Sequence, residues 1–272
     1  MIEPVWQQFL ALLPSRETDH PLGCHRPRVP DRVVFEKLVQ ILVFGCAYWR
    51  IADESCSATT LRCRPEEWIE AGVMDELEEM ARESYDRTVG LDLADVAVDC
   101  GITKAPCGAE KAGRSPVDRG NRGIKRSTAV DARGIPLGTI AAPANRHDSP
   151  LLAETLDAVA EALGELPERA SVHLDRGYDS KVTRERLRER GLLAEISEKG
   201  KPAPMSATKR WVVETDQLVE HNAHNKLVWC TERCGRVIAF WVAFSNAIII
   251  VGRLIREAWS RYRWEPRPTR RP

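Results

Sequence analysis

The stretch Ala170-Ser-Val-His-Leu-Asp-Arg-Gly-Tyr-Asp179 decides how the rest of the chain is interpreted. Val172 and Leu174 alternate with polar residues ahead of a glycine, a pattern typical of a half-buried strand that ends in a turn. Asp175 then stands at the carboxyl end of that strand, the edge at which open α/β sheets place their sites. The stretch therefore predicts a functional carboxylate at Asp175.

A second stretch of the same kind, Asp95-Val-Ala-Val-Asp99, lies upstream and also closes an apolar strand with an aspartate. Two carboxylates at the ends of two strands suggest a site for a divalent metal ion, because Mg²⁺ prefers oxygen ligands. Phosphodiester cleavage uses such ions to activate the attacking oxygen and to stabilise the leaving oxygen. Asp99 and Asp175 fit the first two positions of that kind of site.

The order of the expected elements between residues 91 and 196 predicts a mixed sheet with helices packed on it. After the strand that ends at Asp99, residues 124–131 and 136–140 are expected to form an antiparallel hairpin joined by a turn that contains Gly134. A helix from 148, the strand to Asp175, a helix over 181–190 and a strand over 192–196 follow. This order is that of an RNase H-like sheet, in which the strands ending at Asp99 and Asp175 would be parallel neighbours.

A third acidic residue is expected from a later helix, and the segment Lys209-Arg-Trp-Val-Val-Glu214 supplies it. Any one of the three acids, taken alone, is better explained as a surface charge or a helix cap. Two acids that close apolar strands, followed by Glu214, favour a catalytic group of three.

The first 90 residues have helical periodicity. Asp31 is expected to cap a helix that Gly45 ends, Ser55 or Ser57 to cap the next segment, and Pro65 to begin a further helix. Short helices with a glycine turn resemble a helix-turn-helix arrangement, and a plain helical bundle explains the pattern equally well. We expect a helical DNA-binding domain over residues 1–90 and an RNase H-like catalytic domain over residues 91–272.

Composition restricts the possible partners. Forty basic and forty acidic residues cancel, but the basic residues cluster between 104 and 126 and again after 253. Separate basic stretches suit a polyanion-binding face, and unrelated solvated loops explain them about as well.

The apolar run over 237–251 is shorter than the ~20 residues that a membrane span needs, so we expect a buried core helix.

The eight cysteines contain no Cys-x-x-Cys pair, and no secretory signal precedes Met1-Ile-Glu-Pro. Free thiols in a reducing, cytoplasmic compartment are the simplest explanation. His221, His224, Cys230 and Cys234 occur in an order that suits zinc, but their spacing matches no common structural zinc site.

Nearly the whole chain resembles the bacterial insertion-sequence transposases of the DDE, RNase H-like superfamily. The stretches that carry the resemblance include Asp31-Arg-Val-Val-Phe35, Ser57-Ala-Thr-Thr-Leu-Arg62, Val98-Asp99, Gly113-Arg-Ser-Pro-Val-Asp-Arg-Gly120, Lys125-Arg-Ser127, Asn145-Arg-His-Asp-Ser149, Leu174-Asp-Arg-Gly-Tyr-Asp179, Arg210-Trp-Val-Val-Glu214, Leu227-Val-Trp-Cys-Thr-Glu-Arg233 and Tyr262-Arg-Trp-Glu-Pro-Arg-Pro268.

The resemblance implies that Asp99, Asp175 and Glu214 are the catalytic, metal-binding triad, with Mg²⁺ (or Mn²⁺) as cofactor. It also implies binding to double-stranded DNA at the terminal inverted repeats of the element and at the target, by a homo-oligomer in the bacterial cytoplasm, at the nucleoid and with no membrane involved. Basic residues in the matched stretches are expected to contact DNA: Arg62, Arg114, Arg119, Arg122, Lys125, Arg126 and Arg176.

One segment departs from the family pattern. Glu214 is usually followed by Arg-Thr and soon by Ser-Trp, whereas here Thr-Asp-Gln-Leu-Val-Glu220 follows before the match resumes. A compensated pair of small insertions or deletions in the gene would explain this, and an alternative reading frame of codons 215–220 would reveal it. Three functions therefore stay open: an active transposase, an impaired copy that only binds DNA, and a metal-dependent nuclease that does not join strands.

Overall fold

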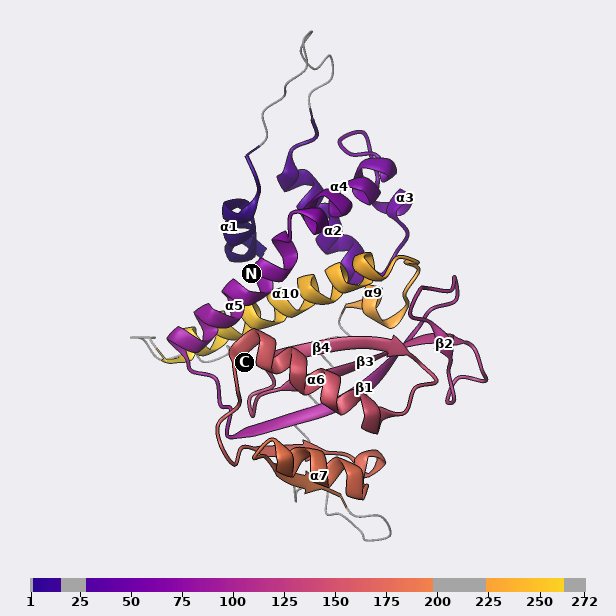
Figure 1. The fold of residues 1–272 in the computed structure, drawn as a ribbon. Helices are drawn as coiled ribbons and strands as arrows, with labels where there is room; N and C mark the ends of the chain where they lie inside the picture. Colours follow the sequence, from indigo (N-terminus) through magenta and orange to yellow (C-terminus); the bar gives the residue numbers. More distant parts are fainter. Residues whose placement is uncertain (1, 16–27, 198–223, 262–272) are drawn as a thin grey trace, which may run out of the picture.

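A computed structural model describes residues 2–15, 28–197 and 224–261 (Figure 1). A layer of helices lies along one edge of a mixed sheet, and two further helices pack on the sheet itself. The predicted RNase H-like α/β class, a mixed sheet flanked by helices and preceded by a helical region, is confirmed by this architecture.

The helical layer combines the first part of the chain with its last described part. Its members are α1 (Ile2–Leu12), α2 (Asp31–Phe44), α3 (Tyr48–Ile51), α4 (Ala58–Glu70), α5 (Val73–Thr88), α9 (Asn225–Val228) and α10 (Gly235–Arg261). α10 runs beside α5 above the β4 edge of the sheet (Figure 1).

One apolar core holds these helices together. Phe9 of α1, Phe35 of α2, Trp68 of α4 and Phe244 of α10 meet in a chain of ring contacts with centroids 4.7 to 5.3 Å apart. By length and composition α10 could cross a membrane, but 72% of its apolar stretch is buried here. The prediction of a buried core helix is confirmed. The division at residue 90 stays a prediction, because α10 shares its core with the first five helices.

The sheet has the predicted order of elements and the predicted parallel pairing, and β2 is an additional strand in the segment expected to be a loop. Its strands are β1 (Asp95–Lys104), β2 (Gly113–Arg114), β3 (Arg122–Val130), β4 (Pro136–Pro143), β5 (Ser171–Leu174) and β6 (Leu193–Ile196), and the helices between them are α6 (Asp148–Leu163), the 3₁₀ turn η1 (Arg176–Tyr178) and α7 (Lys181–Glu189). β1, β3 and β4 form an antiparallel meander, and β5 joins β1 in parallel with β6 beyond it.

One face of the sheet is apolar and packs on α6. Val98 of β1 and Val172 of β5 share a core with Leu156 of α6. Because side chains alternate along a strand, the neighbours of these valines point to the opposite face. Asp95 and Asp99 of β1 and His173 of β5 therefore lie on the face away from α6.

Three helix or strand boundaries expected from the sequence are wrong. Asp31 is the first residue of α2 and caps nothing; its carboxylate instead pairs with the buried guanidinium of Arg64. Pro65 lies inside α4, which Ser57 caps by accepting a hydrogen bond from the Thr60 amide at 3.2 Å. A proline costs a helix one backbone hydrogen bond, and Pro65 is nevertheless accommodated inside α4, where both it and Trp68 are buried.

The third boundary concerns β1. This strand continues past Asp99 to Lys104, because β3 pairs with it along the whole distance from Ala97 to Lys104. Asp99 consequently lies within a strand. The parallel partner of β1, β5, ends at Leu174, so that Asp175 directly follows a strand end.

Gly45 offers a test of how the helical layer is joined. It ends α2 at φ +64°, and an added Cβ would stand 2.7 Å from the carbonyl carbon of Asn225 in α9. Gly72 has nearly the same φ, +69°, with nothing within 4 Å of an added Cβ. Gly72→Ala should therefore cost only the left-handed conformation, about 1 kcal/mol, and Gly45→Ala about 2–3 kcal/mol because the chain of α9 must also move. Denaturant unfolding measures both, and equal losses would contradict a tight contact between α2 and α9.

Candidate active site

Asp99 and Asp175 come together where β5 ends against β1. The parallel register pairs Asp95 with Ser171 and Ala97 with His173. Two residues further along each strand, the same register sets Asp99 beside Asp175, which is still extended at φ −75° and ψ 172°. Adjacent strands lie about 4.8 Å apart, so both carboxylates stand on the face away from α6, within reach of shared ligands.

The loop that carries Asp175 is fixed at several points. One carboxylate oxygen of Asp175 accepts a hydrogen bond from the Gly177 amide at 2.7 Å, which caps η1. Tyr178 is fully buried in the core beneath α6, with its hydroxyl 3.1 Å from the Cys100 thiol of β1. Ser180 then caps α7 through the Thr183 amide at 3.1 Å. The second oxygen of Asp175 is thus held in a defined direction by a loop anchored in the core.

A buried polar pair fixes the two strands just before the acids. His173 Nε2 and Asp95 Oδ1 are 2.7 Å apart, and His173 is only 7% exposed. Sequence reasoning missed this pair, although the alternation that places Asp175 on the polar face places His173 there too. The pair sets the alignment of β5 on β1, and with it the alignment of Asp99 and Asp175.

The third predicted acid, Glu214, lies outside the described residues, as do the helix expected around it and the altered segment over 215–220. Among the residues that are described, no group of three or more His, Cys, Asp or Glu side chains could hold a metal ion. His221 of the possible zinc group also lies outside them. His224 is buried with Nδ1 2.7 Å from the Ser245 hydroxyl, and burial lowers the pKa of His224 to about 4.

Five of the seven predicted DNA contacts are exposed. Arg62 lies on α4, Arg176 directly follows Asp175, and the other three surround the turn between β2 and β3: Arg114, Arg119 and Arg122. Guanidinium groups on an exposed turn can reach phosphates without prior rearrangement.

Lys125 and Arg126 are placed differently. The Lys125 ammonium is buried, donates a hydrogen bond to the Arg146 carbonyl at 2.6 Å and pairs with the Asp148 carboxylate. Arg126 lines a small cavity with Leu227 of α9 and Trp241 of α10. Burial lowers the pKa of Arg126 to about 10. Contact of either side chain with DNA would first require these packing interactions to open.

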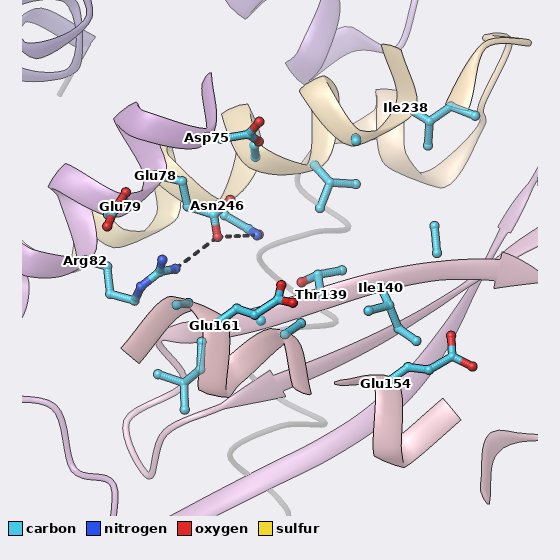
Figure 2. A pocket seen from close by; sticks show the side chains of 18 of the residues that line it. Asp75, Glu78, Glu79, Arg82, Thr139, Ile140, Glu154, Glu161, Ile238 and Asn246 are labelled. Atoms are coloured by element: carbon cyan, nitrogen blue, oxygen red, sulfur yellow. Dashed lines mark hydrogen bonds and ion pairs between the residues drawn. The ribbon is translucent and has the colours of Figure 1, made fainter. Parts of the chain in front are cut away.

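The cavity of about 560 Å³ between the helical layer and the sheet is acidic. Figure 2 shows carboxylates of α5 and α6 approaching it from opposite walls, and they comprise Asp75, Glu78, Glu79, Glu154 and Glu161. Arg82 and Lys111 are the basic residues of its lining. Such a surface repels phosphates, so this cleft does not qualify as a DNA site.

Glu78 gives the cleft a pH dependence. Its carboxylate accepts a hydrogen bond from Asn246 of α10 at 3.1 Å (Figure 2), and burial raises its pKa from 4.5 to about 7 against the opposing effect of Arg82. The folded state therefore holds this proton more tightly than the unfolded state, so stability present near pH 4.5 is lost as pH rises to about 7. Relative to Glu78→Gln, the wild type should lose about 2–3 kcal/mol across that window. Denaturant unfolding of both proteins at pH 4.5 and pH 7.5 measures the difference, and parallel pH profiles would contradict it.

Comparisons with known proteins agree on one family. The model of the "Transposase DDE domain" matches residues 102–216, which include Asp175 and Glu214 and begin just after Asp99. The model "Putative transposase of IS4/5 family" matches residues 1–78. The putative transposase for insertion sequence element IS402 of Burkholderia cepacia is 37% identical over 120 residues, which are 42% of this chain and 57% of that protein.

Among solved structures, the Mos1 mariner paired-end complex with Mn aligns at a TM-score of 0.37 and 10% identity, over 97% of this chain and 88% of that one. The pre-cleavage Mos1 transpososome aligns at a TM-score of 0.35 and 11% identity, over 95% of this chain and 84% of that one. The fold assignment rests on the strand order and register described above. On the sequence matches over residues 1–78 and 102–216, the chain belongs to the DDE transposases of insertion sequences.

Proposed function

We propose that this protein binds the ends of its own insertion sequence, hydrolyses a DNA strand there and joins the freed 3′-hydroxyl to target DNA. DNA transposition is the activity of the family to which the chain belongs. The observation that carries the finer proposal is the register that sets Asp99 beside Asp175 on the polar face of the sheet.

The carboxylates suit a divalent metal ion by their chemistry. Asp99 and Asp175 offer hard oxygen donors on neighbouring strands, and the Gly177 hydrogen bond occupies one Asp175 oxygen only. Members of the family generally use divalent ions, and Mg²⁺ (or Mn²⁺) held by Asp99, Asp175 and Glu214 would make water more acidic and relieve charge on the leaving oxygen. Rigid strands then contribute orientation, because they hold both carboxylates against one scissile phosphate.

The basic residues supply the DNA contacts. Arg114, Arg119 and Arg122 on the β2–β3 turn, with Arg176 beside Asp175, would bind phosphates of double-stranded DNA at the terminal repeats and the target. The protein would act as a homo-oligomer on two ends, in the cytoplasm at the nucleoid.

A second function is favoured by one observation. The match to the DDE domain ends at residue 216, two positions after Glu214 and just where the sequence departs from the family pattern. A copy altered there would retain its DNA contacts and lose cleavage, and would occupy element ends as a DNA-binding protein only.

Incubation with labelled duplex DNA separates the two functions. The duplex should carry the sequence that flanks the coding region, with Mg²⁺ or Mn²⁺ present. Nicking followed by joined products supports the transposase, whereas a mobility shift without any nick supports the DNA-binding copy. Nicked products that are never joined would reduce the proposal to a nuclease.

A further inference from the structure

A basic groove lies at the C-terminal end of β1. Its volume is about 530 Å³, and it is lined by Lys104, Pro106, Arg114, Asp118, Gly120, Asn121, Arg122 and Trp229. Lys104 ends β1, five residues beyond Asp99. At about 3.3 Å per strand residue, the groove begins about 16 Å from the acidic pair.

The charge of the groove suits phosphates. Lys104 Nζ lies 3.7 Å from Asp118 Oδ2, so this carboxylate neutralises the charge of Lys104. Arg114 and Arg122 form no ion pair within residues 2–15, 28–197 and 224–261, and both are exposed. Two guanidinium groups on adjacent strands, joined in register as Arg114 with Arg122, present a surface for a chain of anions.

Trp229 gives the groove a flat aromatic wall. Its side chain is 47% exposed, although a tryptophan normally buries most of its surface. Its backbone forms a bridge with Lys104, and the next amide, of Cys230, donates to the Lys104 carbonyl at 2.8 Å. The backbone that carries the indole is therefore fixed beside the cations.

We propose that, where the bound duplex is opened, this groove holds one of its two strands, with the phosphates of that strand on Arg114 and Arg122 and an unpaired base stacked on Trp229. Stacking on an exposed indole requires a base that is not paired in a duplex, and cations beside an aromatic wall are the usual composition of sites for single strands. The inference rests on the proposed function, and it specifies that DNA next to the cleavage point is unpaired when bound.

The test compares two labelled probes with the full-length protein, a blunt 20-base-pair duplex of mixed sequence and the same duplex with a 3′ overhang of four nucleotides. One overhang base is 2-aminopurine, whose fluorescence falls when it stacks. Wild type should bind the overhang probe about tenfold more tightly and quench its fluorescence. Trp229→Ala should lose about tenfold on that probe only, with the quenching, and Trp229→Phe should retain most of both.

Trp49→Ala is the matched control, because Trp49 is 66% exposed on α3 and does not line the groove; it should leave the preference for the overhang probe and the quenching unchanged. Arg114→Gln and Arg122→Gln should weaken both probes and reduce the salt dependence of binding. Equal affinity of wild type for the two probes, or equal loss on both in Trp229→Ala with a normal unfolding curve, would overturn the proposal. A preference without any nicking would leave this inference standing while the proposed cleavage failed.

Discussion

Asp175→Asn is expected to reduce cleavage of element-end DNA by more than 100-fold without loss of fold or of DNA binding. Asparagine is nearly isosteric and can still accept the Gly177 amide that Asp175 Oδ1 accepts at 2.7 Å, so the loop should stay in place. The lost quantity is the negative charge beside Asp99. Even removal of a group that merely supports a metal ligand typically costs 10–100-fold, so loss of a ligand charge should cost more.

Asp179→Asn is the matched control for this change. Asp179 follows η1 on the same loop, and its carboxylate pairs with Arg184 of α7 at 3.0 Å. It should cleave at the wild-type rate. A mobility shift and an unfolding curve for each variant separate loss of chemistry from loss of binding or stability, and equal nicking by wild type and Asp175→Asn would refute the site assignment. Asp99→Asn should behave as Asp175→Asn does.

The arrangement of this site could be predicted from the sequence because its signals are local. The apolar alternation before Asp99 and Asp175 identifies two strands, and the elements between them leave few ways of arranging a sheet. Their adjacency then follows from the parallel pairing, as the register from Asp95 to Ala97 shows.

Features that depend on distant partners could not be predicted. β1 continues beyond Asp99 because β3 pairs with it, and no property of β1 alone indicates where that partner ends. Lys125 belongs to a basic stretch and so looked like a DNA contact, yet α6 brings Asp148 against it and buries it. The sequence shows how many basic residues a stretch contains, whereas tertiary packing determines which of their side chains are exposed to solvent.

Gly177→Ala is expected to reduce DNA cleavage although it leaves the charge of Asp175 unchanged. An added Cβ on Gly177 would stand 2.9 Å from Asp175 Oδ1, closer than a carbon and an oxygen can approach. The carboxylate must then turn away from the Cβ, which distorts its hydrogen bond from the Gly177 amide and changes the direction of its oxygens. Because the residue acts by positioning Asp175, the expected loss of cleavage is about 10–100-fold, with DNA binding retained.

Gly191→Ala controls for general destabilisation. Gly191 follows α7 with φ +70° and nothing within 4 Å of an added Cβ, so alanine there costs about 1 kcal/mol of backbone strain far from Asp175. Gly191→Ala should lower the unfolding midpoint and leave the cleavage rate unchanged. Gly177→Ala should lower the cleavage rate and leave the unfolding midpoint nearly unchanged. Equal cleavage by the two variants would show that the direction of the Asp175 carboxylate is not set by this hydrogen bond. The expected contrast would instead locate catalytic precision in η1, the turn that joins the end of β5 to the buried Tyr178.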